Sequence, residues 1–356
     1  MTPRVALVGY GSAGRTIHAP LLGAAGAAPA LVATASPERA AQVAADLPGA
    51  DVVPDLAAAL AARPDLVVLA SPSGVHAGQA LQCVAAGVPV VVDKPLAVDA
   101  DQARRVVVAA DASGVALTVF QNRRWDAENL TLRRLLADGD LGSVHRFERR
   151  WERWRPVPKA RWREQATAAD GGGLLLDIGP HVVDAALLLF GAAESVYAET
   201  AARTTTAEDD AFVSIRHAGG VRSHLTLGAV VGAPGPRSRV LGSRGAYVVT
   251  ELPGEPAVFA GFADAPGHCG WFVAGDERRP VPRAEGAPVD FYRAVLAALA
   301  VPAADVAGRR AALPVDPWDA VAVAEVLDAA RRSAEQGRPV DLPAAAHGRR
   351  ERTGEQ

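Results

Sequence analysis

The chain has 356 residues, of which 49% are hydrophobic and 22% charged, and its formal net charge is -3. This length predicts two domains, because one domain usually holds about 100 to 200 residues. The charge balance offers nucleic acid or an anionic membrane no basic patch, and no apolar run reaches the roughly 20 residues of a membrane helix. Two cysteines without zinc-ligand spacing predict a metal-free protein with no disulfide framework. The N-terminus does not have the pattern of a signal peptide, so we expect a cytoplasmic protein.

Strand-like and helix-like segments alternate through the first 120 residues. Short apolar runs predict the strands, and longer Ala-rich runs predict helices between them. This alternation is typical of a doubly wound parallel sheet, which binds its ligands at the carboxyl ends of the strands. The predicted strands are 5–8, 30–35, 66–70, 88–92 and 116–120, and the predicted helices are 37–46, 56–62, 76–86 and 101–113.

A glycine-rich turn joins the first predicted strand to the first helix. Its Gly-x-Gly-x-x-Gly spacing at Gly9, Gly11 and Gly14 is that of a dinucleotide-binding loop. The first glycine makes the tight turn, the second lets the backbone approach a pyrophosphate, and the third lets the helix pack closely on the strand. The helix N-terminus then faces the anion. The expected cofactor contacts at this loop and at two later strand ends are Gly9, Tyr10, Gly11, Ser12, Ala13, Gly14, Ser71, Pro72, Lys94 and Pro95.

The end of the second predicted strand bears on the choice of cofactor. NAD sites usually carry an acidic residue about 20 residues after the glycines, where it accepts hydrogen bonds from the adenosine ribose. Here Ser36 occupies that region with Arg39 close by. A small hydroxyl and an arginine leave room for a 2′-phosphate, which favours NADP over NAD and makes both residues expected cofactor contacts. In the alternative interpretation, Glu38 and Arg39 are only the solvated first turn of a helix.

Lysine is rare in this chain, since 35 of its 37 basic side chains are arginine. Lys94 directly follows the predicted strand 88–92, whereas Lys159 belongs to no comparable motif. The pKa of a lysine responds to burial, as proton chemistry requires, and that of an arginine does not. The sequence therefore marks Lys94 as a candidate catalytic residue at a strand end.

Four of the six tryptophans lie among arginines in the segments 121–126, 151–155 and 161–163. Acidic residues are mixed with them, which argues against a phosphate-binding surface for nucleic acid. Two interpretations stay open. The arginines stack on the tryptophans at a domain or subunit interface, or the two residue types line a pocket for a polyhydroxylated ligand.

A second glycine-rich segment, 171–173, precedes an aspartate and a histidine four residues apart, Asp177 and His181. If the segment is helical, these two side chains share a face. Pro180 fits the first position of a helix, which places His181 near a helix N-terminus. The positive end of the helix dipole disfavours an imidazolium there and keeps the ring available as a base. We therefore expect Asp177 and His181 to be catalytic.

Together these motifs resemble those of the Gfo/Idh/MocA oxidoreductase family, over nearly the whole chain. The segments 121–126 and 161–164 are similar to the branch of the family that contains NADP-dependent scyllo-inositol dehydrogenases. The motifs that carry the resemblance are Gly9-x-Gly11-x-x-Gly14 followed by His18 and Pro20, the tripeptide Asp93-Lys94-Pro95, and Gly171-Gly172-Gly173 followed by Asp177 and His181.

The resemblance implies an α/β fold with a Rossmann domain of doubly wound parallel sheet over residues 1–120. A C-terminal α/β domain with a large, open, mostly antiparallel sheet follows over 121–345. That sheet often serves for dimerisation in the family, so we expect a homodimer or a homotetramer. An amphipathic run predicts a helix near 316–334, which we expect to pack back on the first domain, and 346–356 forms a polar tail.

The resemblance also implies reversible hydride transfer between nicotinamide and a secondary alcohol of a polyol, an inositol or a sugar. His181 then acts as general base, Lys94 stabilises the alkoxide and holds the nicotinamide ribose, and Asp177 orients His181 or a neighbouring hydroxyl. Asp93 stands where the family usually has Glu, and the arginine of a Ser-Arg pair expected after the second strand is missing. The expected substrate contacts are Lys94, Asn122, Arg123, Trp125, Arg161, Trp162, Asp177 and His181. An aldose, a nucleotide-linked sugar, an imine or an unsaturated substrate stays open, as does a cofactor-binding sensor without turnover.

Overall fold

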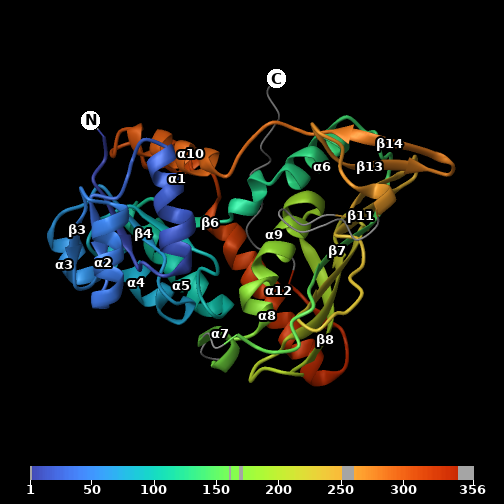
Figure 1. Cartoon of the computed structure of the whole chain (residues 1–356), viewed down its shortest axis with the longest axis horizontal. Helices are drawn as coiled ribbons and strands as arrows, with labels where there is room; N and C mark the ends of the chain where they lie inside the picture. The colour runs from blue at the N-terminus through green and yellow to red at the C-terminus, as the bar shows by residue number, and fades with distance from the viewer. Residues whose placement is uncertain (1, 160–161, 168–170, 251–259, 344–356) are drawn as a thin grey trace.

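The computed structural model describes residues 2–159, 162–167, 171–250 and 260–343. Two sheets form two units that lie side by side, and the chain passes from the first to the second after β6 (Figure 1). The predicted polar tail 346–356 and the predicted contact Arg161 lie outside the described residues.

The first unit is a parallel sheet of six strands in the order β3-β2-β1-β4-β5-β6, with every pairing parallel. This is the strand order of a doubly wound dinucleotide-binding domain, in which the winding reverses between β1 and β4. The strands are β1 Val5–Val8, β2 Leu31–Ala33, β3 Asp51–Val53, β4 Leu66–Leu69, β5 Val90–Asp93 and β6 Leu117–Phe120. The helices are η1 Gly14–His18, α1 Ala19–Ala24, α2 Pro37–Asp46, α3 Leu56–Ala61, η2 Ser73–Val75, α4 His76–Ala85 and α5 Ala100–Ser113.

Successive side chains of a strand point to opposite faces of the sheet, and helices cover both faces of this one. In β1, Ala6 belongs to one hydrophobic cluster with residues of α3, α4 and α5, whereas Leu7 belongs to another with residues of α1 and α2. The strand β3 was not among the predicted elements. It lies at the edge of the sheet and Val52 is 41% exposed, so it lacks the continuous apolar run that identifies a buried strand.

The second unit is a sheet of nine strands in the order β14-β13-β12-β11-β7-β10-β9-β8-β15, antiparallel except for the pair β7 and β10. Along β9 the side chains alternate between buried and partly exposed, so one face packs on helices and the other is open. The strands are β7 Val144–Glu152, β8 Ala193–Ala201, β9 Asp210–His217, β10 Arg222–Gly228, β11 Ser238–Gly242, β12 Ala246–Val249, β13 His268–Ala274, β14 Glu277–Pro282 and β15 Val340–Asp341. The accompanying helices are η3 Asn122–Trp125, α6 Ala127–Ala137, α7 Trp162–Gln165, α8 Leu174–Asp177, α9 Gly179–Phe190 and η4 Ala260–Phe262.

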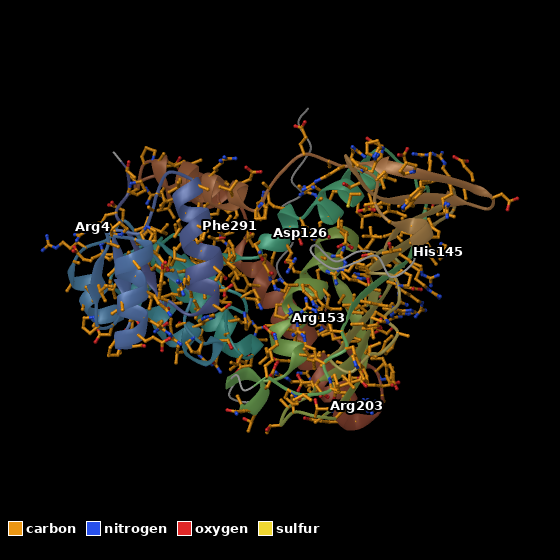
Figure 2. All side chains as sticks on the ribbon, in the orientation of Figure 1. Arg4, Asp126, His145, Arg153, Arg203 and Phe291 are labelled. Atoms are coloured by element: carbon orange, nitrogen blue, oxygen red, sulfur yellow. The ribbon has the colours of Figure 1, made fainter. Side chains whose placement is uncertain are left out.

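The last helices, α10 Val289–Ala300, α11 Val306–Ala311 and α12 Pro317–Gln336, follow the second sheet in the chain but also complete the first unit. Phe291 of α10 is fully buried in the same cluster as Leu7 of β1 (Figure 2). Along α12, Val321 packs in a core of the first unit and Val326 in the core of the second. The return of the chain to the first unit therefore involves more than the single helix that the sequence predicted.

Candidate functional site

The glycine loop after β1 has the shape that a dinucleotide requires. Gly9 has φ +96°, and an added Cβ there would lie 2.7 Å from the carbonyl oxygen of Ala70. A Cβ on Gly14 would lie 2.1 Å from the carbonyl oxygen of Gly9. Around Gly11, by contrast, an added Cβ would meet no atom within 4 Å. Two glycines thus serve the close packing of the loop, and the third borders open space that a pyrophosphate can occupy.

This difference predicts opposite behaviour for two alanine substitutions. Gly14→Ala is expected to lower the midpoint of thermal unfolding, because its methyl group would overlap the backbone of Gly9. Gly11→Ala is expected to leave that midpoint unchanged and to weaken NADP binding by about tenfold or more, because the methyl group would occupy ligand space. Unfolding scans and calorimetric titration of the two variants check this. A Gly11→Ala protein with unaltered cofactor affinity would contradict the assignment of this loop.

The other residues expected at the cofactor lie at strand ends around this loop. Ser36 accepts a hydrogen bond from the backbone of Arg39 at 3.3 Å and thereby caps α2, whose first turn exposes the Arg39 side chain. The side chain of Tyr10 packs in the core, and its hydroxyl donates to the exposed Asp46 at 3.2 Å. Tyr10 can therefore serve the loop through its backbone only.

Lys94 and Asp177 meet although they come from different units. Lys94 follows β5, and its Nζ donates to the carbonyl oxygen of Asp177 at 2.6 Å and to Oδ1 at 3.3 Å. Asp177 ends α8, and His181 lies in the first turn of α9 just after it, with Pro180 beside it. The ring of His181 is nearly parallel to that of Trp151 on β7, with 5.9 Å between the ring centroids. The structure thus brings the three residues predicted to be catalytic to the junction of the two units.

Beneath Lys94 lies a buried carboxylate, that of Asp93. It accepts a hydrogen bond from the backbone of Lys94 at 2.8 Å, and Nε2 of His18 lies 3.7 Å from Oδ1. Burial alone would raise the pKa of Asp93, but His18 and the charges of Lys94 and His76 lower it to about 2. Asp93 is therefore ionised at neutral pH. The stability it contributes is present above the pKa of an unfolded aspartate and is lost as pH falls toward 2.

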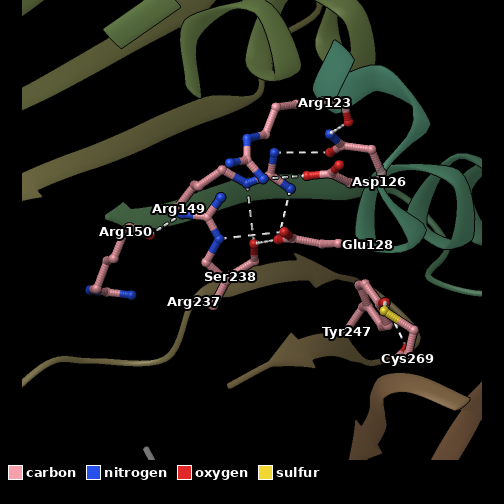
Figure 3. A network of polar contacts seen from close by, with 10 residues as sticks. Arg123, Asp126, Glu128, Arg149, Arg150, Arg237, Ser238, Tyr247 and Cys269 are labelled. Carbon is pink, nitrogen blue, oxygen red and sulfur yellow. Dashed lines mark hydrogen bonds and ion pairs between the residues drawn. The ribbon is translucent and has the colours of Figure 1, made fainter. Parts of the chain in front are cut away.

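Three guanidinium groups lie against the ring of Trp151, and two of them, those of Arg123 and Arg237, belong to the polar network drawn in Figure 3. The Cζ atoms of Arg123, Arg237 and Arg153 lie 4.6, 4.5 and 5.5 Å from its ring centroid. These arginines come from η3, from the turn before β11 and from the turn after β7, respectively. The pairing of arginine with tryptophan expected from the sequence is thus present at the same ring on which His181 stacks.

Carboxylates on α6 and its N-terminal turn balance much of this positive charge. Glu128 lies 2.8 Å from Arg149 and 3.4 Å from Arg237, and Asp126 lies 2.9 Å from Arg123 (Figure 3). Burial, together with the charges of Arg149 and Arg123, lowers the pKa of Arg237 to about 10. The arginines beside Trp151 therefore form a donor-rich wall, and the carboxylates of Glu128 and Asp126 offset part of its charge.

The remaining substrate contacts expected from the sequence have different surroundings. Trp125 packs edge-on against Phe291 of α10, with 5.5 Å between the ring centroids, and so contacts the core of the first unit. Asn122 begins η3 next to Arg123. The backbone of Trp162 begins α7, and its side chain lies outside the described part of the chain.

Several residues at the junction were not expected from the sequence. Arg237 has no motif around it and reaches Trp151 only through the pairing of β11 with β7. Arg124 of η3 forms a buried ion pair with Asp184 of α9, at 2.5 Å, and lies 2.9 Å from Asp319 of α12. The double arginine at 123–124 was a signal, but it does not tell which arginine faces the site. Arg123 is the one that contacts Trp151, and it belongs to the polar network in Figure 3.

Two features that could suggest other functions are not found in the described part of the chain. No group of three or more His, Cys, Asp or Glu side chains there could hold a metal ion. Among the same residues, no helix combines the length and apolarity needed to cross a bilayer.

Comparisons with known proteins cover both units. Residues 3–121 match the oxidoreductase family with an NAD-binding Rossmann fold, and 129–248 match the GFO/IDH/MocA C-terminal domain. The chain is 31% identical to scyllo-inositol 2-dehydrogenase (NADP(+)) of Bacillus subtilis, with 96% of both chains covered. It is 40% identical to the Escherichia coli oxidoreductase YdgJ over 69% of this chain and 70% of that one.

Solved structures agree with this assignment. The Bacillus subtilis oxidoreductase yvaA superposes with a TM-score of 0.82 at 28% identity, covering 96% of this chain and 99% of the other. The WlbA dehydrogenase of Bordetella pertussis, solved with NADH and UDP-GlcNAcA, has a TM-score of 0.76 at 26% identity and coverage of 97% and 100%. The predicted α/β architecture is confirmed, and the chain belongs to the Gfo/Idh/MocA family of NAD(P)-dependent oxidoreductases.

Proposed function

We propose that the protein is an NADP-dependent dehydrogenase that oxidises a secondary alcohol of a polyol, with an inositol such as scyllo-inositol as the preferred class, and catalyses the reverse reduction. The observation that carries the proposal is the contact of Lys94 with Asp177, one helical turn before His181. The similarity to a scyllo-inositol 2-dehydrogenase over 96% of the chain supports the substrate class.

The described residues supply the proton chemistry of such a reaction. When bound, the nicotinamide supplies the two-electron acceptor. His181 receives the proton of the reacting hydroxyl, and its position in the first turn of α9 disfavours a pre-existing positive charge on the ring. Lys94 presents a partly buried ammonium to the developing alkoxide, and Asp177 fixes the position of that ammonium. Correct placement of the carbon that reacts contributes as much as acid and base.

The preference for NADP is supported by the residues after β2. Thr34 and Ser36 are small hydroxyl residues at the strand end, and Ser36 is followed by the exposed Arg39 on the first turn of α2. A carboxylate at this strand end would repel a 2′-phosphate, and none is present at 34–36. Arg39 then supplies the charge that NADP requires and NAD does not.

A polyhydroxylated substrate suits the wall formed by Trp151 and its arginines. The guanidinium groups can donate to the hydroxyls of such a substrate, and the buried Trp151 ring packs against these groups and against His181. A nucleotide-linked sugar is the second candidate, because the similar WlbA structure holds UDP-GlcNAcA. We also propose that the open face of the second sheet serves self-association as a homodimer or homotetramer. Phe212 lies on that face, opposite to the buried side chains of β9.

A panel assay tests the proposed function. The purified protein is mixed with NADP or NAD and scyllo-inositol, myo-inositol, glucose or a UDP-sugar, and the absorbance of the reduced nicotinamide is followed. The expected result is turnover with an inositol and a higher kcat/KM with NADP than with NAD. Measurable cofactor binding without turnover of any substrate would contradict the proposal and favour a sensor. Turnover of the UDP-sugar alone would favour the second candidate.

A further inference from the structure

His76 lies between the two turns that follow β4 and β5. It begins α4, and its side chain is 1% exposed. Nε2 lies 2.8 Å from the carbonyl oxygen of Ser71, and Nδ1 lies 2.7 Å from the carbonyl oxygen of Pro95. Both of these residues stand in turns expected to hold the cofactor, and Pro95 directly follows Lys94.

The two distances decide the protonation state of the ring. A carbonyl oxygen only accepts hydrogen bonds, and a neutral imidazole has only one N–H. In either neutral tautomer, one ring nitrogen would turn its lone pair toward a carbonyl oxygen at less than 3 Å. Only the imidazolium donates at both positions. We infer that His76 is an imidazolium at neutral pH and a positioning residue that fastens the Ser71 turn to the turn carrying Lys94.

The surrounding charges act on the His76 ring in both directions. The ionised carboxylate of Asp93, on β5, interacts favourably with a charged His76. The ammonium of Lys94 and the N-terminus of α4 have the opposite effect on the ring. Nε2 of His18, from η1, lies 3.7 Å from Oδ1 of Asp93 and shares that carboxylate. The imidazolium therefore depends on Asp93 and on the two carbonyl oxygens together. Charge-assisted hydrogen bonds to buried carbonyl groups are stronger than neutral ones, which strengthens the link between the turns.

A second buried histidine in the same chain shows the contrast. His217 is also 1% exposed, with Nδ1 at 2.9 Å from the carbonyl oxygen of Gly191. Its Nε2, however, lies 2.7 Å from Oγ of Ser223, and a hydroxyl can donate as well as accept. A neutral ring therefore satisfies both partners of His217. The two histidines match in burial and differ in the chemistry of one partner, which makes His217 the internal control.

The charged state of His76 has a consequence for cofactor binding. A histidine whose pKa is raised in the folded protein contributes its stabilisation below its unfolded pKa and loses it as pH rises through the folded value. Deprotonation would remove one of the two links between the turns. The affinity for NADP is therefore expected to fall as pH rises and His76 loses its proton. This effect is on cofactor binding and does not require a change in kcat. This part rests on the proposed binding of NADP at these turns.

The protonation state is measured on the unaltered protein. In long-range proton–nitrogen correlation spectra of the full chain with labelled histidine, both ring nitrogens of His76 are expected to show the N–H form at pH 7, and one nitrogen of His217 the unprotonated form. His76→Gln and His217→Gln identify the two sets of signals. A neutral His76 at pH 7 would overturn the inference. This measurement needs neither cofactor nor substrate, so its outcome does not depend on whether the proposed function is correct.

The positioning role is measured by NADP binding as a function of pH. The wild-type affinity is expected to weaken across the pH range in which the His76 signals titrate. A glutamine at position 76 can donate well to only one of the two carbonyl oxygens. His76→Gln is therefore expected to bind NADP about tenfold more weakly at pH values below that range, and its affinity should no longer change with pH across the range. His217→Gln should keep the wild-type profile. An unchanged profile in a folded His76→Gln protein would refute the role, and if that variant fails to fold, the wild-type profile and spectra decide.

Discussion

Replacement of Lys94 by methionine is expected to lower kcat by about 10² to 10³-fold while leaving NADP binding within a few-fold of wild type. Methionine keeps much of the length of the side chain but cannot donate to Asp177 or to an alkoxide. Loss of one preorganised donor to a developing negative charge has an effect of this size in other enzymes. Steady-state kinetics with the best substrate of the panel, together with titration of NADP, separates the two effects.

Lys159 provides the matched control for this substitution. It is the other lysine of the chain and is exposed, so Lys159→Met removes the same charge without touching the site. We expect unchanged kcat and KM for that variant. If Lys94→Met turned over as fast as Lys159→Met, the role proposed for Lys94 would be wrong.

The buried ion pair of Arg124 should give the largest effect on stability. Its guanidinium donates to both carboxylate oxygens of Asp184 and also to Asp319, and so links η3 to α9 and α12. Arg124→Met would leave the Asp184 carboxylate buried without this counter-charge. Breaking a buried pair from one side typically costs about 3 to 5 kcal/mol. The expected result is a lower midpoint in urea unfolding, because the free energy of unfolding falls linearly with denaturant.

An exposed pair on α10 gives the comparison for this experiment. Arg293 lies 2.8 Å from Asp290, three residues earlier on the same helix, and its side chain is 60% exposed. Arg293→Met is expected to change the free energy of unfolding by less than about 1 kcal/mol, because water and salt screen such pairs. Equal effects of the two substitutions would show that the buried network around Arg124 contributes no more than a surface pair.

The first sheet could be predicted because each of its central strands is buried on both faces. Runs such as 66–69 and 90–92 are continuous apolar stretches, bounded by turns, and the glycine loop fixes where the first helix starts. The second sheet was predicted only as a class, through the family resemblance. Its strands alternate between one buried and one open face, and charged residues such as those of β7 interrupt the pattern. No local signal distinguishes such strands well from loops.

The candidate site divides in the same way. Residues carried by short motifs, Lys94, Asp177 and His181, were identified because their neighbours in sequence restrict their surroundings. The contributions of Arg237 and His76 depend on contacts between segments far apart in sequence, and composition alone cannot reveal those contacts. Trp151 lies between these cases, since its segment attracted notice but its position under His181 required the fold.

The shared helices bear on the order in which the molecule is built. Ribosomes release a chain from its N-terminus, and domains commonly fold as they emerge. Here the sheet made first receives Phe291 and Val321 into its cores, and these residues are synthesised after nearly the whole second sheet. The first unit therefore keeps apolar surface uncovered until α10 and α12 have been synthesised. Of the two units that meet at Lys94 and Asp177, the unit that is synthesised first cannot complete its hydrophobic core until helices that follow most of the second sheet are available.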